Sequence, residues 1–315
     1  MIQDKYLLDF IEYHPKWKEL LAQAPYHLRI QENGNRYIFT STEQSDMTNN
    51  LCRCANGIIV EVREYLLEYI RLSQKVGMWD KKLVDVMHRS WYQYEGMPDN
   101  TMVRMPRIIV RGFDKFFKHD DFYAATIDWS SAQALEKIDG TLVRYTTIDD
   151  QLKWFVDEDF DASRSISDDF IGSPDDYYDL IEGIIGETHM MTSVAFALKE
   201  LGVHYYFNFE LVSPWNSGHN ESKLYWLSVR HKESGLECLP QNMMDLWNKG
   251  LLPHNSTITE SAKSAHEVLM KAFPRPASFE VRSIQDALDR KKAVIVHDSD
   301  FNLISIGEND ETISA

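Results

Sequence analysis

The chain has 315 residues, 43% of them hydrophobic and 12% aromatic, which suits one large core or two modest domains and excludes an intrinsically disordered protein. Its formal net charge of −16 argues against a protein that coats nucleic acid, although one basic groove could still grip a strand. No apolar run reaches the roughly 18–20 residues of a membrane span, and the N-terminus does not resemble a secretory signal. Three cysteines are too few for a disulfide framework, so we expect reduced thiols and a cytoplasmic protein.

The first third of the chain is predicted to contain a helix, two strands, a second helical stretch and a third strand. An amphipathic helix over 6–20 is interrupted by a proline, which cannot donate a backbone hydrogen bond. Strands at 37–40 and 58–62 each follow an Asn-Gly turn signal. A helical pattern over 62–87 precedes a strand at 104–110.

A locally basic stretch begins in that strand and is the exception to the acidic composition. Its cations are Arg104, Arg107, Arg111, Lys115 and Lys118. On spacing alone, a solvated face is favoured over a nucleic-acid groove for such a run.

The rest of the chain alternates between strands and helices. Two strand-like pieces within 123–144 flank Lys137, at a point where the chain must turn. A helix opens at 173–176, where Ser, Pro and two Asp suit a helix N-terminus, and its apolar stripe can extend to Leu201. The remaining expected strands are 205–212, 224–230 and the hairpin 293–296 with 303–306, and the remaining helices are 259–273 and 283–290. This order, with several antiparallel pairs, predicts an α+β fold.

Lys137 is the best candidate for a residue that carries chemistry. It stands in the run 136–141 (EKIDGT), two residues before an Asp-Gly pair. An ε-amine that has lost its proton can attack the α-phosphate of a nucleotide and form a phosphoamide. The pattern K-x-D-G arises by chance in about one chain in fifteen of this length, so a surface lysine beside a turn is the alternative.

Three further segments accompany this run in a fixed order. The run 136–143 resembles motif I of the ATP-dependent RNA ligases, in particular the phage ligases that repair broken tRNA. Upstream, 111–117 (RGFDKFF) resembles the R-P-x-x-K-F-F element of that family. Downstream, 162–166 (ASRSI) is similar to its T-K/R-G-S segment, and 207–216 (FNFELVSPWN) resembles its F-E-x-V-x-P-x-N motif III. The likeness covers roughly residues 30–307.

The resemblance implies a nucleotidyltransferase domain of the RNA and DNA ligase type, an ATP-grasp-like adenylation fold of antiparallel sheets flanked by helices. Lys137 would be the adenylated nucleophile, Asp139 would help to position it, and Gly140 would let the backbone turn beside the nucleotide. The cofactors would be ATP and Mg²⁺, with the metal held by few protein carboxylates and by the phosphates, and with its protein ligands unknown.

The resemblance also implies residues that bind the nucleotide. Lys115 and Phe117 would lie beside it, with Lys115 near the phosphates. Arg164 would contact phosphate. Glu210 would hydrogen-bond the ribose, and the alternative for this residue is a strand-end glutamate that faces water.

The chain departs from the family at the groups that manage metal and α-phosphate charge. Residues 56–57 (NG) replace an Arg-Gly, and Arg290 to Lys292 stand where motif IV has a Glu-Gly. Residues 305–307 (SIG) replace the K-x-K of motif V. Loss of such contacts can slow a reaction by about 10²–10³ for each contact, unless Lys291 and Lys292 substitute for them.

Three functions therefore compete. The first is an ATP-dependent RNA ligase that joins a 5′-phosphate to a 3′-hydroxyl of tRNA-like or single-stranded RNA ends. The second is a degenerate ligase-like protein that binds a nucleotide, RNA ends or a protein partner. The third is a nucleotidyltransferase that modifies another substrate. We expect an N-terminal helical segment over 1–30 and the nucleotidyltransferase domain over 31–315, with a helical insertion at about 63–103.

Overall fold

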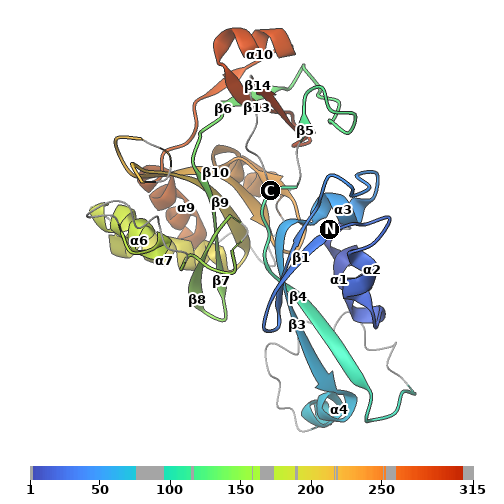
Figure 1. Ribbon diagram of the computed structural model, residues 1–315. Coiled ribbons are helices and arrows are strands. Elements are labelled where there is room, and N and C mark those ends of the chain that lie inside the picture. Colours follow the sequence, from blue (N-terminus) through green and yellow to red (C-terminus); the bar gives the residue numbers. More distant parts are fainter. Residues whose placement is uncertain are drawn as a thin grey trace. The chain divides into compact units, whose positions relative to one another are not determined.

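The computed structural model of the chain describes residues 3–75, 96–114, 117–157, 159–163, 174–188, 191–215, 217, 219–250, 252 and 260–307. The chain divides into two compact units, the N-terminal unit Ile2–Ile109 and the C-terminal unit Val110–Ala315 (Figure 1). The expected domain limits at 30 and 31 do not coincide with this division, and they stay a prediction about domains.

The N-terminal unit contains one antiparallel sheet of four strands, in the order β1-β2-β3-β4. These strands are β1 Arg29–Asn33, β2 Arg36–Thr40, β3 Asn56–Leu66 and β4 Met102–Val110. The described helices of the unit are α1 Gln3–Tyr13, α2 Trp17–Leu21, α3 Asn50–Cys54 and α4 Leu67–Lys75. The break between α1 and α2 falls at Pro15, and the strands expected at 37–40, 58–62 and 104–110 are confirmed.

Alternation along β2 decides which side of this sheet the first helices cover. Tyr37 and Phe39 point to one face, where the Trp17 ring of α2 lies 4.9 Å from the Tyr37 ring and 5.8 Å from the Phe39 ring, centroid to centroid. Buried Leu7 and Ile11 bring α1 into the apolar core of the unit. The amphipathic N-terminal helix is thereby explained by burial of one apolar stripe.

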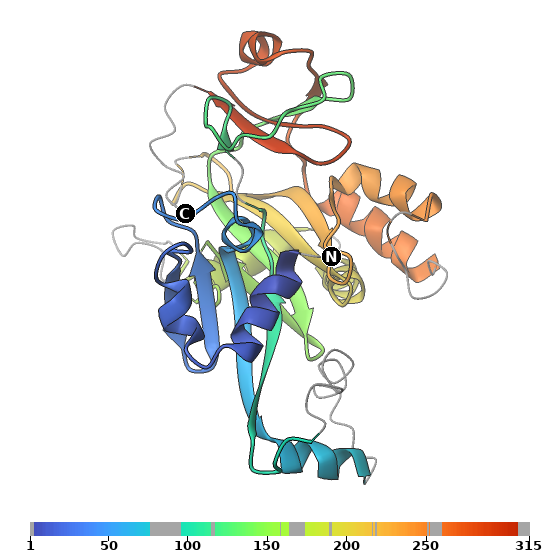
Figure 2. The same cartoon turned by 90° about the vertical axis from the view of Figure 1, so that its right-hand side faces the viewer.

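The helix expected over 62–87 is wrong at its start. Strand β3 continues to Leu66 and α4 begins at Leu67, while residues 76–87 lie outside the described part of the chain. Strands β3 and β4 are neighbours in the sheet, and Arg104 Nε binds Glu64 Oε1 at 3.1 Å. In Figure 2, β3 and β4 run together to α4. Pairing with a distant strand overrides the local helical pattern.

The C-terminal unit contains two sheets of five strands. The middle sheet has the order β11-β10-β9-β7-β8, and all of its neighbours are antiparallel. Its strands are β7 Thr141–Ile148, β8 Gln151–Val156, β9 Tyr205–Val212, β10 Lys223–His231 and β11 Glu237–Cys238. The closing sheet has the order β12-β6-β13-β14-β5, with β14 parallel to β5. Its strands are β5 Phe117–Lys118, β6 Gln133–Glu136, β12 Ser278–Glu280, β13 Ala293–His297 and β14 Leu303–Gly307.

Helices cover one face of the middle sheet. They are α6 Tyr177–Glu187, α7 Met191–Gly202 and α9 Glu260–Ala272, and Figure 1 shows them gathered on one side of that sheet. Their apolar faces share a core with the odd-numbered side chains of β7 and β9, such as Tyr145, Phe207 and Phe209. The segment Pro240–Asn242 (η2) and α8 Met243–Asn248 follow β11, and α10 Ile284–Arg290 packs in the core of the closing sheet.

The α+β fold with antiparallel sheets flanked by helices is confirmed, and so are the strands expected around Lys137 and in the closing hairpin. The N-cap of α6 differs from the expectation, because the Asp176 carboxylate accepts the Asp179 N–H at 3.0 Å. The apolar stripe that was expected to continue to Leu201 is divided between α6 and α7. Among the described helices, none combines the length and the hydropathy that crossing a bilayer requires.

Candidate functional site

Residues 137–140 connect the two sheets of the C-terminal unit. Strand β6 ends at Glu136 in the closing sheet, and β7 begins at Thr141 in the middle sheet. The Lys137 N–H donates to the Ala293 carbonyl of β13 at 3.2 Å, and the Lys137 side chain is half-buried. The candidate nucleophile is thus fixed through its backbone at the point where the chain leaves one sheet for the other.

Gly140 is required by close approach to a neighbouring strand. A Cβ at this position would lie 2.4 Å from the Leu211 carbonyl oxygen of β9 and 3.1 Å from a Val212 methyl. Backbone atoms cannot withdraw from such a contact as a flexible side chain can, so only glycine fits. The Gly140 N–H also hydrogen-bonds the Glu210 side chain. The turn predicted to follow Lys137 is therefore joined directly to the residue predicted to bind the ribose.

The Glu210 carboxyl lies at the centre of the charged groups of the site. It is half-buried on β9, and Lys137, Asp139 and Asp157 all lie within electrostatic reach of its carboxyl. Burial raises the pKa of Glu210 to about 8, and the carboxylates of Asp157 and Asp139 act in the same direction. The Gly140 N–H and the Lys137 ammonium oppose this rise. A carboxyl with this pKa carries a proton at neutral pH and can donate a hydrogen bond.

Asp157 is a site residue that sequence reasoning missed. It follows β8, and its N–H donates to the Leu142 carbonyl at 2.8 Å, while Leu142 stands opposite Glu210 in the register of β7 and β9. Asp157 and Glu210 therefore flank β7 at the same level of the sheet. In sequence, Asp157 begins an acidic stretch that is typical of a solvated loop, and only the pairing of β7 with β8 brings it to the site.

The face of the middle sheet that carries Glu210 is polar, opposite to the face under the helices. Arg144 and Asn208 are opposite each other on β7 and β9, and both are fully buried. Arg144 Nη2 donates to the Asp157 carbonyl oxygen. Asn208 Nδ2 donates to Ser228 Oγ of β10 at 2.9 Å.

Residues 111–114 lie against the same polar face. A Cβ on Gly112 would meet the Arg144 side chain at 3.2 Å. Fully buried Arg111 forms an ion pair with Asp114, and Arg230 of β10 lies 3.5 Å from the other oxygen of that carboxylate. Burial alone would raise the pKa of Asp114, but the two guanidinium groups outweigh it and hold that pKa below its ordinary value. The segment 111–114, the turn 137–140 and strand β9 therefore meet on one face.

Arg230 also joins this network to β11. Its guanidinium binds the buried Glu237 carboxylate at 2.5 Å, and Ser228 Oγ donates to Glu237 at 2.6 Å. The other charges near β10 are engaged elsewhere: Lys223 pairs with Glu221, and Lys232 Nζ donates to the carbonyls of Thr147 and Gly202.

The other predicted site residues lie in or next to the closing sheet, or outside the described residues. Phe117 lies in β5, at the edge of the closing sheet, beside Ile304 and 5.8 Å from the Tyr123 ring. Lys291 and Lys292 are exposed, and Lys291 Nζ binds Glu136 Oε1 at 3.0 Å. Lys115 and Arg164 lie outside the described residues.

Metal-binding side chains are few in this region. Within the described ranges, no three His, Cys, Asp or Glu residues are grouped so that they could hold a metal ion. Asp139 and Asp157 lie close enough to Glu210 to influence its carboxyl electrostatically. Such carboxylates suit a cation that brings most of its own oxygen ligands, as Mg²⁺ does when phosphates and water complete its octahedron.

Comparisons with known proteins find similar solved structures. No protein-family model matches the chain, and no curated protein sequence matches it. It is similar to a solved structure described as an archaeal ATP-dependent RNA ligase, form 1, at 10% identity and a TM-score of 0.42, over 98% of this chain and 64% of that chain. Form 2 of the archaeal ligase gives 10% identity and a TM-score of 0.41, over 97% and 64%. The chain thus spans about 64% of the length of these ligases.

Proposed function

We propose that the chain is an ATP-dependent RNA ligase-like nucleotidyltransferase that forms lysyl-AMP on Lys137 and joins RNA ends. One observation supports this most strongly. In the turn that carries Lys137, the Gly140 N–H donates to Glu210. Glu210 belongs to the segment 207–216, which resembles motif III of the ligases. Two segments that are far apart in sequence, and that the resemblance assigns to one nucleotide site, therefore touch.

The proposed reaction has three steps. The Lys137 amine, after losing its proton, attacks the α-phosphorus of ATP, so that a nitrogen–phosphorus bond forms and pyrophosphate leaves. An oxygen of an RNA 5′-phosphate then attacks this phosphorus, which breaks the bond to Lys137 and transfers AMP to the RNA. A 3′-hydroxyl finally attacks the activated 5′-phosphate, and AMP leaves as the phosphodiester forms.

The side chains around Lys137 have separable roles in this proposal. Protonated Glu210 donates a hydrogen bond to a ribose hydroxyl and so orients the nucleotide toward the amine. Asp139 helps to place the amine, and its backbone carbonyl lies 3.2 Å from His219 Nε2. Phosphoryl transfer depends mainly on positioning and on neutralisation of charge. Mg²⁺ would supply that neutralisation, and Asp139 and Asp157 would be the carboxylates that hold it.

A second candidate function is favoured by the positions of Lys291 and Lys292. Lys291 is bound by Glu136 and Lys292 is exposed. A ligase-like protein that binds a nucleotide, RNA ends or a protein partner without turnover would not need them to replace the missing motif IV and V groups.

Transfer of label from α-labelled ATP separates the two candidates. We expect the wild type with Mg²⁺ to retain labelled AMP through denaturation, and we expect Lys137→Ala to lose the label by more than about 10³-fold, because the attacking nitrogen is gone. Lys263→Ala, on α9 of the same unit, serves as the matched control and should label as the wild type does. If the wild type takes no label between pH 6 and 9, the catalytic proposal is wrong and the binding function remains.

The RNA step needs its own assay. The labelled protein should pass AMP to an oligonucleotide with a 5′-phosphate and then join it to a 3′-hydroxyl end. Comparison of a nicked tRNA-like hairpin with two linear single strands would define the substrate. Transfer of AMP to neither of them would restrict the proposal to a nucleotidyltransferase that modifies another substrate.

A further inference from the structure

We infer that the N-terminal unit binds single-stranded RNA in a pocket between α2 and strands β2 to β4. This inference rests on the proposed function for its ligand class, and it assigns a binding site in the unit that does not contain Lys137. The cavity is about 760 Å³ in volume, and every residue that lines it belongs to the N-terminal unit. That volume suits a ligand of one or two nucleotides.

The distribution of charge between the units directs a polyanion to this unit. Residues 2–109 contain fourteen Lys and Arg and fourteen Asp and Glu, so they are neutral. The whole net charge of −16 is therefore carried by the rest of the chain. The pocket itself is lined by four cations (Lys16, Lys18, Arg63 and Arg104) and by two acids (Glu19 and Glu64). Phosphate is repelled by the acidic unit and attracted here.

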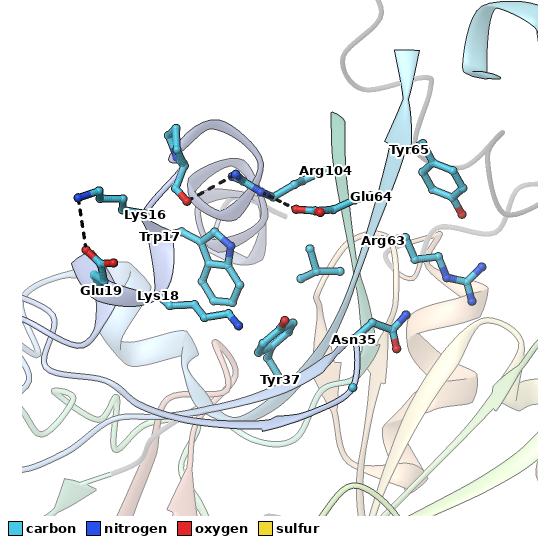
Figure 3. A pocket seen from close by; sticks show the side chains of 13 residues that line it. Lys16, Trp17, Lys18, Glu19, Asn35, Tyr37, Arg63, Glu64, Tyr65 and Arg104 are labelled. Carbon is cyan, nitrogen blue, oxygen red and sulfur yellow. Dashed lines mark hydrogen bonds and ion pairs between the residues drawn. The ribbon is translucent and has the colours of Figure 1, made fainter. Parts of the chain in front are cut away.

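The ion pairs around the pocket can be exchanged for contacts with phosphate. Lys16 lies 3.8 Å from Glu19, and their side chains are 76% and 67% exposed. Lys18 binds Glu32 at 2.6 Å, with side chains 43% and 48% exposed. Exposed pairs of this kind add little to stability, so exchange of the carboxylate for a phosphate oxygen is easy. In Figure 3 the Lys18 ammonium points into the pocket, above the Tyr37 ring.

The accessible aromatic side chains of this region, Tyr65 and Tyr69, provide a surface for bases. Buried Tyr37 and Trp17 form one wall of the pocket, and Lys18 Nζ lies 4.5 Å from the centroid of the Tyr37 ring. Tyr65 lines the other side, beside Arg63 (Figure 3). The Tyr65 ring lies almost parallel to that of Tyr69, at 7° and 6.1 Å between centroids, and Tyr69 is 52% exposed. A stack with an exposed face can be extended by a nucleobase.

Together these features favour a single strand over other anions. Bases are accessible for stacking only when they are unpaired, so a duplex would use the cations and not the rings. An acidic peptide would likewise use the cations alone. RNA with free ends is also the substrate of the proposed reaction. Binding of the single-stranded segments next to those ends would help to hold this substrate on the protein.

Fluorescence anisotropy with a labelled 12-nucleotide oligouridylate in about 50 mM NaCl tests the inference. We expect Lys18→Glu and Tyr65→Leu each to weaken binding about tenfold, through a lost phosphate contact and a lost stack. The matched controls are Lys5→Glu and Tyr6→Leu, which change exposed residues of α1 in the same way and should bind as the wild type does. Thermal unfolding of each variant checks that it is folded.

Several outcomes would overturn the site. One is that the control variants lose as much oligonucleotide affinity as the pocket variants. Another is that a duplex of the same charge binds as tightly as the single strand. A third is that polyglutamate of matched charge competes as well as the unlabelled oligonucleotide. This test is independent of the proposed chemistry. Lys137→Ala should bind the oligonucleotide normally, and Lys18→Glu should still form lysyl-AMP. If the protein takes no AMP label but the pocket variants lose oligonucleotide binding, only the ligase proposal is contradicted. If the protein takes the label but the pocket variants bind the oligonucleotide as the wild type does, only this inference is contradicted.

Discussion

The two units of the chain place their charges in opposite ways. The C-terminal unit carries the whole net charge of −16, yet it buries Arg111, Arg144 and Arg230 against its middle sheet. The N-terminal unit is neutral, and it groups Arg36, Arg63 and Arg107 around the buried carboxylate of Glu61. Those three arginines keep between 25% and 33% of their side chains exposed.

This difference shows that the total charge of a chain says little about any one surface. The value of −16 argues against nucleic-acid binding only if the acidic residues are spread evenly, and here they are not. In the acidic unit the buried cations are bound to acceptors inside the protein. In the neutral unit the three arginines bind Glu61, but part of each side chain stays exposed to solvent.

The largest effect on stability that this comparison predicts comes from removal of a buried cation. Arg230→Met would leave Glu237 buried without its guanidinium, so we expect a loss of about 3–5 kcal/mol in the free energy of unfolding. Arg63→Met, at a half-exposed site in the neutral unit, should cost less than about 1 kcal/mol. Denaturant titrations of both variants measure the difference. Similar losses would mean that burial does not distinguish the two sets of arginines.

A smaller effect should depend on pH and is specific to the candidate site. The pKa of Glu210 is about 8 in the folded chain, against an ordinary value of 4.5. The unfolded chain therefore releases this proton first, and the stability of the folded state falls as pH rises from about 4.5 to 8, by on the order of a few kcal/mol.

Glu210→Gln should remove this dependence. Relative to the wild type, the variant should be more stable at pH 8 and nearly equal at pH 4.5. Unfolding measured in denaturant at several pH values would show the change in slope. Glu182→Gln, at an exposed position of α6, should keep the wild-type slope. A Glu210→Gln profile parallel to that of the wild type would contradict the assignment of a protonated Glu210.

The smallest predicted change concerns the close approach at Gly140. Gly140→Ala places a methyl group 2.4 Å from the Leu211 carbonyl, and we expect a loss of about 1–3 kcal/mol and weaker AMP labelling, because the turn must shift. Gly183→Ala in α6 is the matched control, because nothing lies within 4 Å of its Cβ, and it should be neutral or slightly stabilising. Thermal unfolding would compare them, and equal melting temperatures for both variants would contradict the contact.

Much of the fold can be read from local patterns in the sequence. The closing hairpin, the strands on either side of Lys137 and the interrupted N-terminal helix follow from alternation, turn residues and a proline. The expectation fails where long-range pairing decides the structure. The end of β3 reads as helix because its charged residues are compatible with both periods, and only the adjacent β4 fixes it as a strand.

Part of the candidate site, like part of the fold, could be predicted from the sequence. Lys137, Asp139, Gly140 and Glu210 could be proposed together because a family pattern orders them, and the structure brings them together. Asp157 and Arg144 could not be proposed. Their place depends on the register of β7 with β8 and β9, which single-residue patterns do not contain.

The four-residue link between the two sheets limits how the C-terminal unit can move. Its first residue is bonded to β13 of the closing sheet and its last residue to Glu210 of the middle sheet. A fully extended link of four residues spans at most about 14 Å. The sheets can therefore rotate about this point, but they cannot separate there by more than that length. The backbone of Lys137 therefore stays close to both sheets in any such motion.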